Sequence, residues 1–231
     1  MAIDVAFDFR TDTPRGRDPD QRSPTLRRYH QLLWSKRLPS GPMFQLSAAT
    51  PGSYLYHDSP MGEFWLKSDS VMQTFTRWKR MRAITGQLAD EENDFFATIT
   101  YTIGGMMLFP GNPIDGRWTI NQARGCLRSI ADRFDLTLEC IRSHYQGDDS
   151  PLAPYLALYP EFFRLFGDFS GYVEFFLLDD LIRDGQVQFF TPFSDFSDPA
   201  LPRDLDAYVE FRRSSIEFVE ARNRRIQQLN L

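Results

Sequence analysis

Three short segments in the N-terminal half of the chain alternate apolar and polar residues, and Pro or Gly residues separate them. These segments are MFQLS (43–47), SYLYHD (53–58) and GEFWLKSD (62–69). A period of two is typical of strands with one buried face. The apolar segment Phe95–Phe109 predicts a further strand, which Gly104 and Gly105 would interrupt as a bulge. The N-terminal half therefore predicts a small antiparallel sheet.

Helical spacing begins before this sheet and dominates the chain after it. Ser23 and Pro24 are typical of an N-cap and a first helical position, and the residues that follow place Leu26, Tyr29 and Leu33 on one face. Further helices are predicted at 71–84, Thr119–Ala131, Arg133–Tyr145, Tyr159–Gly167 and Gly171–Asp184. The pattern also predicts a late strand at QVQFFTPF (186–193) and a long final helix at 202–229.

The order of these elements predicts the fold class. Strands come early and helices late, which is typical of an α+β fold in which a small antiparallel sheet from the N-terminal half packs against a mainly helical C-terminal half. The polar segment 10–22 is broken by Pro and Gly residues and is predicted to be irregular. A chain of 231 residues fits a single domain over 1–231.

Composition and charge narrow the class of protein. Hydrophobic residues make up 42% and aromatic residues 15% of the chain, which is enough for a packed core, and the net charge of −5 gives no overall attraction to nucleic acid. No apolar run reaches the ~18 residues of a membrane span, and the N-terminus lacks the pattern of a signal peptide. Two cysteines cannot form the disulfide framework of a small secreted protein. We therefore expect a cytoplasmic protein that does not contact a membrane.

The segment 119–145 contains the densest group of candidate functional residues. Five of its charged residues follow one another at helical spacings of three or four and form one ridge: Arg128, Asp132, Asp135, Glu139 and Arg142. This ridge is either a solvated face of ion pairs or the source of a catalytic carboxylate pair, with Asp135 or Glu139 as the general base. We predict no metal site and name no cofactor.

Arg124 and Arg133 are candidates for a buried network with carboxylates. Arg133 lies on an apolar helix face, and an unpaired buried charge is very costly, so it needs a partner. The apolar segment GYVEFFLLDDLIRD (171–184) supplies Asp179 and Asp180, which would hold the two arginines in place. Such a network is either architecture or the wall of a polar pocket.

The pocket interpretation leads to the first functional hypothesis. Asn121 and Gln122 follow a glycine-containing loop at the start of a predicted helix, where free N–H groups suit an anion. The loop contains neither the P-loop pattern nor G-x-G-x-x-G. We expect a small anionic ligand, a nucleotide or a phosphorylated compound, with Arg124 and Arg133 contacting the anion and the two amides orienting it. If the protein is an enzyme, transfer or hydrolysis is the expected reaction class.

Basic residues near the N-terminus indicate a different class of function. No acidic residue lies between Gln21 and His57, and the helix predicted there places Arg27, Arg28 and Lys36 near one another. This surface would serve a non-catalytic module that contacts a protein or a nucleic-acid backbone. In the competing interpretation, the same side chains dock onto the acidic C-terminal half of the chain.

Several longer phrases of the sequence are similar to those of one family. The phrases are SPTLRRYHQLLWSKRLPSG, GEFWLKSDS, TINQARG, DRFDLTLECIRSHY and GYVEFFLLDDL. Together they resemble a family of bacterial proteins of unknown function and of about this length, over Ile3 to Phe196. The resemblance implies a bacterial, cytosolic, single-domain protein, and it brings no activity or catalytic residue with it.

Overall fold

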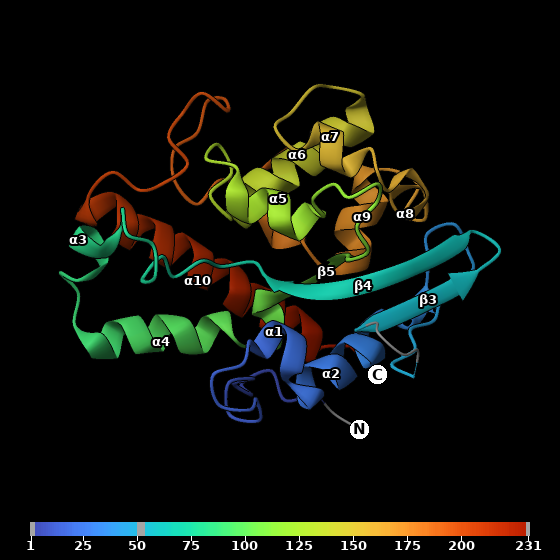
Figure 1. Ribbon diagram of the computed structural model, residues 1–231, viewed down its shortest axis with the longest axis horizontal. Helices are drawn as coiled ribbons and strands as arrows, with labels where there is room; N and C mark the ends of the chain where they lie inside the picture. Colours follow the sequence, from blue (N-terminus) through green and yellow to red (C-terminus); the bar gives the residue numbers. More distant parts are fainter. Residues whose placement is uncertain (1–2, 50–53, 230–231) are drawn as a thin grey trace.

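The computed structural model describes residues 3–49 and 54–229 and has a mixed α+β fold (Figure 1). Its central element is a three-stranded antiparallel sheet, in which β4 (Gly62–Ser70) lies between β3 (Leu55–Ser59) and β5 (Met106–Pro110). The sheet belongs to the N-terminal half of the chain, and most of the helices follow it. The predicted fold class is therefore confirmed.

Alternating burial explains why β4 forms and how it is oriented. Phe64, Leu66 and Ser68 are buried, and the residues between them are exposed, so one face of the strand is turned to the core. Leu66 pairs with Leu55 of β3 on one side and with Pro110 of β5 on the other. The strand β5 is buried along its whole length. The strand predicted at 62–69 is thus confirmed.

The neighbouring strands are shorter than their sequence patterns predict. The strand predicted at 53–58 forms β3, and Ser53 lies outside the described residues. In the segment 43–47 only β2 (Met43–Phe44) forms a strand, and it pairs with β1 (Lys36–Arg37). Ser47 at the end of the segment reaches the central sheet through a single antiparallel bridge to Tyr56 of β3.

The late strand is also shorter than predicted. Within 186–193 only β7 (Gln186–Val187) forms, paired with β6 (Ile182–Arg183) in a separate two-stranded sheet.

Helices surround the central sheet on both sides. In Figure 1, α1 and α2 lie below the sheet, and α5 to α9 lie above it. Their bounds are α1 (Pro19–Arg22), α2 (Pro24–Trp34), α3 (Arg82–Thr85), α4 (Asp90–Thr100), α5 (Ile120–Cys126), α6 (Phe134–Gln146), α7 (Ala153–Leu156), α8 (Pro160–Arg164), α9 (Phe169–Phe176) and α10 (Leu205–Gln227). Short 3₁₀ turns, η1 (Ile103–Gly105) and η2 (Asp179–Leu181), precede β5 and β6.

The two most regular helical patterns are confirmed. Helix α2 begins where predicted, because the Ser23 side chain accepts a hydrogen bond from the N–H of Leu26 and Pro24 occupies the first helical position. Helix α10 corresponds to the predicted final helix, and Asp204 caps it by accepting from the N–H of Ala207.

The long strand predicted at Phe95–Phe109 is wrong over its first part. Helix α4 covers this part, and three acidic residues in its first turn favour a helix N-terminus. Phe96 is buried and Phe95 is exposed. In so short a segment, the apolar pattern of an amphipathic helix is similar to the alternation of a strand. Only the part from Met106 onward forms a strand.

The helix predicted at 71–84 is also wrong. The chain there is mostly irregular, and only α3 at its end is helical. Val71 and Phe75 are fully buried, and Phe75 adopts a left-handed φ of 58° that an α-helix does not contain. Tyr208 of α10 donates to the carbonyl of Thr74 (2.6 Å), so long-range contacts hold this segment in place of local helical bonds.

Other predicted elements differ from the structure at their boundaries, and the reasons are local. The helix predicted at 119–131 ends at Cys126, and the helix predicted at 171–184 ends at Phe176, where Leu177 takes a left-handed φ of 56°. The segment 10–22, predicted to be irregular, contains α1, because Asp18 caps the helix and Pro19 begins it.

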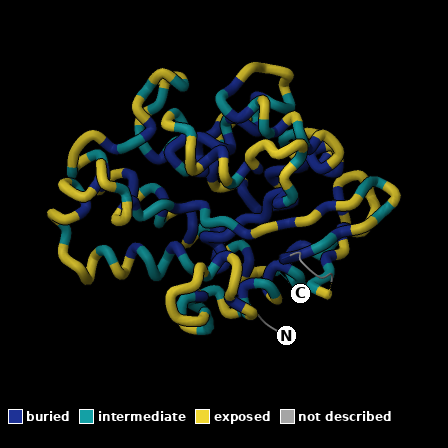
Figure 2. Tube along the Cα trace, in the orientation of Figure 1, coloured by how far each residue is buried: buried dark blue, intermediate teal, exposed yellow. Residues whose placement is uncertain are grey.

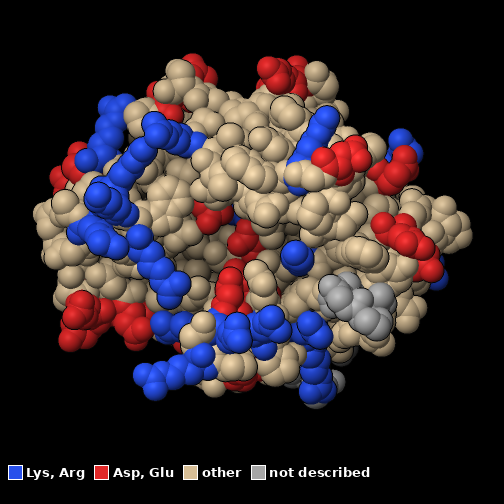
Figure 3. All heavy atoms as spheres, in the orientation of Figure 1, with Lys and Arg blue, Asp and Glu red and all other residues tan. Residues whose placement is uncertain are grey.

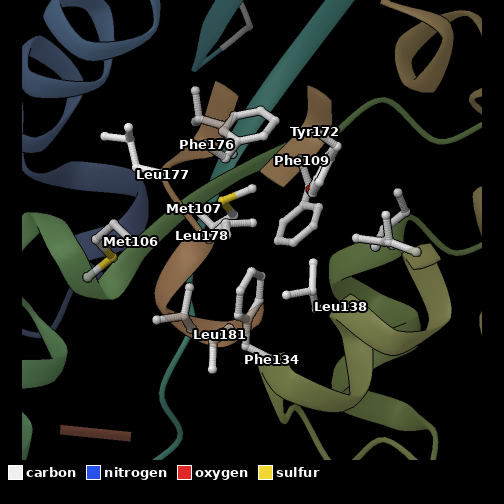
Figure 4. Close-up of a cluster of buried hydrophobic side chains, with 14 of the residues drawn as sticks. Met106, Met107, Phe109, Phe134, Leu138, Tyr172, Phe176, Leu177, Leu178 and Leu181 are labelled. Atoms are coloured by element: carbon white, nitrogen blue, oxygen red, sulfur yellow. The ribbon is translucent and has the colours of Figure 1, made fainter. Parts of the chain in front are cut away.

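The core lies between the sheet and the helices on both sides of it. Figure 2 shows buried residues concentrated along the centre of the fold. In Figure 4, Met107 and Phe109 of β5 meet Phe134 of α6 and Phe176 of α9, and all four are fully buried. This packing fixes β5, and with it the end of β4, against the helical layer.

A buried arginine joins α10 to this core. The Arg222 guanidinium donates to the carbonyl oxygens of Gly104 (3.0 Å), Met106 (2.7 Å) and Phe176 (3.0 Å), and it lies 5.6 Å from the centre of the Trp34 ring. Arg222 is fully buried, and no carboxylate of the described residues forms an ion pair with it. Burial lowers its pKa to about 9, so it keeps its charge at neutral pH.

The 3₁₀ turn η1 approaches α10 so closely that it requires glycine. The N–H of Gly104 donates to Asn223 Oδ1 (2.7 Å). A Cβ on Gly104 would lie 2.6 Å from both Asn223 Oδ1 and the carbonyl oxygen of Val219. These contacts are shorter than van der Waals separation, so a side chain would push η1 away from the helix.

We therefore expect Gly104→Ala to lower the free energy of unfolding by about 3 kcal/mol, because it combines overpacking with a lost buried hydrogen bond. Urea denaturation measures this change. The matched control is Gly125→Ala within α5, where a Cβ has no neighbour within 4 Å and the change should stabilise by about 0.5–1 kcal/mol. Equal effects of the two substitutions would contradict the close-approach argument.

Candidate functional site

The structure gathers aspartates around one buried arginine, Arg124. Its side chain is fully buried, and its Nη1 donates to Asp69 Oδ2 (2.6 Å). Nε donates to Thr137 Oγ1 (2.9 Å), and Nη2 donates to the carbonyl of Ser70 (3.3 Å) and lies 3.6 Å from Asp132 Oδ1. Every nitrogen of the guanidinium therefore has a protein partner.

Local structure brings these partners together. Thr119 and Gln122 form a capping box at the start of α5, and Arg124 lies in the last turn of this helix. Asp69 lies near the end of β4, where it pairs with β5. Asp132 lies in the turn between α5 and α6 with a left-handed φ of 59°, and its backbone N–H donates to the carbonyl of Arg124 (2.9 Å).

A third aspartate reaches the same place from α1. Helix α1 packs on β4, and Asp20 in its first turn is 8% exposed. Burial raises the pKa of Asp20 well above its usual range, and the charges of Asp69, Asp18 and Asp132 raise it further. Arg124 opposes this effect but does not cancel it. We call the site formed by Asp20, Asp69, Asp132 and Arg124 the aspartate recess.

The recess opens on one face of the molecule. Figure 3 shows a hollow near the centre of this face, at the place where α1, the end of β4 and α5 meet in Figure 1, with acidic side chains inside it. Lysine and arginine side chains lie along its lower edge, over α1 and α2, and on its left side, over the segment around α3. The hollow therefore combines an acidic interior with a basic rim.

Asp69 has the ionisation behaviour expected of a group that exchanges protons. Burial raises its pKa to about 7, and the positive charge of Arg124 opposes this rise. Asp132, which accepts a hydrogen bond from Gln73 Nε2 (2.8 Å), adds to the rise by like-charge repulsion. A side chain that is 19% exposed and titrates near neutral pH is a candidate general acid or base.

Unpaired oxygen atoms surround these carboxylates. Asp20 Oδ1, Asn121 Oδ1 and the Tyr54 hydroxyl are buried and have no hydrogen-bond partner among the described residues. Asn121 donates to the carbonyl of Ser68 next to Asp69 (3.5 Å), and the charge of Asp20 contributes to the raised pKa of Tyr54, of which burial is the main cause. Buried polar atoms are normally hydrogen-bonded, so these oxygens leave acceptor capacity beside the carboxylates that the described side chains do not fill.

Arg133 and Asp135 form a separate, closed ion pair. Both are buried, and Arg133 Nε donates to Asp135 Oδ1 (3.1 Å). Arg133 Nη1 also donates to Thr191 Oγ1 (2.8 Å) and to the carbonyl of Ala200 (3.0 Å), while Asp135 accepts from the N–H of Phe190 (2.9 Å). This pair ties the loop before α10 to α6. The Thr137 hydroxyl links it to Arg124, because it accepts from Arg124 Nε and donates to the carbonyl of Arg133 (2.8 Å).

The remaining carboxylates of the sequence hypothesis lie elsewhere. Asp180 binds Arg225 on α10 (3.0 Å), and Asp179 lies 3.7 Å from the same guanidinium. The expected pairing of these aspartates with Arg124 and Arg133 is therefore corrected, because α9 ends before them and η2 turns them toward α10.

The expected ridge of charges on one continuous helix does not form either. Asp132 lies in the turn before α6 and Asp135 is fully buried on that helix, whereas Glu139 pairs with Arg142 near the surface (2.6 Å).

The basic residues predicted to form one surface near the N-terminus lie in two separate places. Arg27 lies 4.9 Å from the centre of the Tyr54 ring, and with Arg22 and Arg28 it lines a groove of about 310 Å³. Lys36 lies apart from this groove, with Nζ 4.6 Å from the centre of the Phe175 ring. Burial, and to a smaller extent the positive charge of Arg222, lower the pKa of Lys36 to about 8. We call the groove of Arg22, Arg27 and Arg28 the arginine groove.

Sequence reasoning missed two of the three aspartates of the recess. Asp20 was placed in an irregular segment, although Asp18-Pro19 is the pattern of an N-cap and first helical position. Asp69 ends the strand predicted at 62–69, directly before the helix predicted at 71–84, and this local pattern does not indicate a contact with Arg124. Among the described residues, no group of three or more His, Cys, Asp and Glu side chains has the arrangement of a metal site.

Fold and site together define an α+β protein with an arginine-centred aspartate recess. The sequence matches the family of unknown function DUF6994 over residues 3–226, so the chain belongs to this family. No curated protein and no solved structure matches the chain. In residues 3–49 and 54–229, no helix has both the length and the apolar character needed to cross a membrane.

The raised pKa of Asp69 predicts a pH-dependent stability. An aspartate of the unfolded chain titrates near pH ~4, so the folded state binds more protons between pH ~4 and ~7. The contribution of Asp69 to the free energy of unfolding is therefore complete below pH ~4 and is lost as the pH rises to ~7. In urea denaturation at a series of pH values, the difference in unfolding free energy between wild type and Asp69→Asn should fall across this window.

The control for this experiment is Asp180→Asn, which changes a partly exposed carboxyl group paired with Arg225. Its difference from wild type shows what the loss of a carboxyl group outside the aspartate recess does over the same range. A difference for Asp69→Asn that does not fall across the window would show that Asp69 does not titrate there.

Proposed function

We propose that the aspartate recess binds a small ligand that has hydrogen-bond donors at one end and an anionic group at the other, and that this ligand is a nucleotide. The observation that carries the proposal is a hollow with acidic side chains inside it and a basic rim around it, together with unpaired buried acceptor oxygens on residues of the aspartate recess and next to it. A nucleobase offers N–H donors to carboxylate and amide oxygens. Its phosphates suit arginine and lysine side chains.

Arg124 has a positioning role in this proposal. Its side chain is fully buried, and its nitrogens face Asp69, Asp132, Thr137 and the carbonyl of Ser70, so it is not presented to an anion in the hollow. Instead, its positive charge holds the carboxylates of Asp69 and Asp132 in place and offsets their mutual repulsion. The anion would lie at the rim, which differs from the expectation that Arg124 and Arg133 bind it directly.

The same site suits hydrolysis or group transfer. Asp69, with a pKa near neutral pH, would accept the proton of the attacking group, in the role that the sequence hypothesis assigned to Asp135 or Glu139. Asn121 would orient the ligand as expected from the sequence. The proposal includes a cytoplasmic location, which the two free cysteines support. It also includes a bacterial origin, which rests on the resemblance of the sequence alone.

Thermal unfolding in the presence of nucleotides tests this function. A ligand at 100 times its Kd stabilises a protein by about 2.7 kcal/mol, so a binding nucleotide should raise the Tm measurably. A nucleoside and pyrophosphate, which each carry half of the proposed ligand, should raise it less. Asp69→Asn and Asn121→Ala should remove most of the shift, and Asp180→Asn should leave it unchanged.

Two outcomes would contradict the proposal. If pyrophosphate stabilises as strongly as a nucleotide, only the basic rim binds. If no nucleotide shifts the Tm of the wild type, the recess is structural. Circular dichroism of each variant shows that a lost shift does not result from unfolding.

A second candidate function rests on the arginine groove. The residues that line it in the described part of the chain include Arg22, Arg27 and Arg28 but no carboxylate. We propose as the alternative that this groove contacts the phosphate backbone of a nucleic acid, without reading its sequence. The position of Lys36 away from the groove makes the proposed contact smaller than the sequence predicts.

This alternative predicts salt-dependent binding of a fluorescent oligonucleotide. Removal of one phosphate contact by Arg22→Ala or Arg27→Ala should weaken binding and reduce the slope of log Kd against log salt by about 1. Fluorescence anisotropy measures both quantities. Arg203→Ala, on the exposed segment before α10, is the control that should change neither. Equal binding by all variants would exclude the groove.

A further inference from the structure

A long groove separates α4 from α10 on the surface of the molecule. Its volume is about 600 Å³, and its apolar lining consists of Leu88, Phe95, Val209 and Ile216. Phe95 is 54% exposed and Val209 is 46% exposed, whereas Phe96, the next residue on α4, is fully buried. Exposed large apolar side chains gathered in one groove mark an interaction surface.

The groove is held in shape by contacts that do not depend on a partner. Arg212 of α10 donates to the carbonyl of Glu92 on α4 (2.5 Å), and its guanidinium lies 5.0 Å from the centre of the Phe96 ring. Phe96 also packs edge-on against Phe211, with ring centres 6.4 Å apart. The two helices are thus fixed relative to each other, and a partner would meet a preformed surface.

The charges beside the groove are acidic on the α4 side and mixed on the α10 side. Glu91 and Glu92 on the α4 side are exposed, as are Arg213 and, one turn further along α10, Glu217. Exposed basic residues also lie on the chain around α3, which packs on α10: Arg77, Lys79, Arg80 and Arg82. In Figure 3, basic side chains over the region of α3 and acidic side chains over α4 lie at the same end of the molecule, with uncharged surface between them.

We propose that this groove is the contact surface for a second copy of the chain in a two-fold symmetric dimer. A two-fold axis that runs along the groove through its apolar centre places Glu91 on the α4 side of one protomer opposite Arg213 on the α10 side of its partner, and the reverse contact follows by symmetry. A partner with charge of a single sign would instead face repulsion on one side of the groove. The proposal is independent of the function proposed for the aspartate recess, because different elements line the two surfaces.

Sedimentation equilibrium of the full chain tests the dimer. The wild type should associate as its concentration rises, and added salt should weaken the association. Phe95→Asp and Val209→Asp should each raise the dimer Kd at least about tenfold, since they place a charge at the apolar centre. Glu220→Arg, at an exposed position on α10 outside the groove, should leave the dimer Kd unchanged.

Charge reversal gives a sharper test of the arrangement. Glu91→Arg should abolish self-association, because it opposes Arg213 of the partner, and Arg213→Glu should do so for the same reason. An equal mixture of the two variants should form a heterodimer, because each then meets the opposite charge on both sides. Both positions are exposed, so the variants should fold as the wild type does.

Two results would overturn the inference. The first is a wild type that remains monomeric up to about 1 mM. The second is an association that Phe95→Asp and Val209→Asp leave unchanged, which would place the dimer contact on another face. A mixture of the charge-reversed variants that stays monomeric, beside a wild type that dimerises through Phe95, would overturn the two-fold arrangement.

Discussion

The hydrogen bonds of buried arginines to backbone carbonyl groups are the constraint on which the arrangement of this fold depends. Arg222 joins three segments that secondary structure leaves with free acceptors: the end of α9 at Phe176, the turn η1 at Gly104 and the start of β5 at Met106. One guanidinium offers five donors in a fixed plane, so it can satisfy several carbonyls at once. Its position on α10 therefore sets this helix against both the sheet and α9.

A related solution creates the candidate site. Arg124 is as deeply buried as Arg222, but its partners include the carboxylates of Asp69 and Asp132. The single positive charge cannot neutralise both of them and Asp20 as well, and burial raises the free energy of the charged forms. As a result, the pKa values of Asp20 and Asp69 are both raised. The ion pair of Arg124 with Asp69 therefore has two effects: it stabilises the core, and it holds a carboxyl group of the candidate site in position.

The two surfaces proposed for interactions differ in the kind of groups that they offer to a partner. In the aspartate recess, oxygen atoms such as Asp20 Oδ1 are left without protein partners, which suits a small polar ligand. In the groove between α4 and α10, Arg212 donates one hydrogen bond to the backbone while its Nε has no partner among the described residues, and the apolar side chains of Phe95 and Val209 are exposed, which suits another protein surface. Different elements supply the two surfaces, so a ligand and a second protomer would not compete for the same side chains.

The sequence by itself determined the fold class, the strand β4, and the helices α2 and α10, because periodic burial and capping residues such as Ser23 act locally. It also marked Arg124 as a buried cation in need of carboxylates. Only the tertiary structure decided which carboxylates these are. Asp69 and Asp20 lie far from Arg124 in the chain, and they reach it because β4 pairs with β5 and α1 packs on β4. Local pattern carries no information on such pairings, since they depend on which surfaces meet when the core closes.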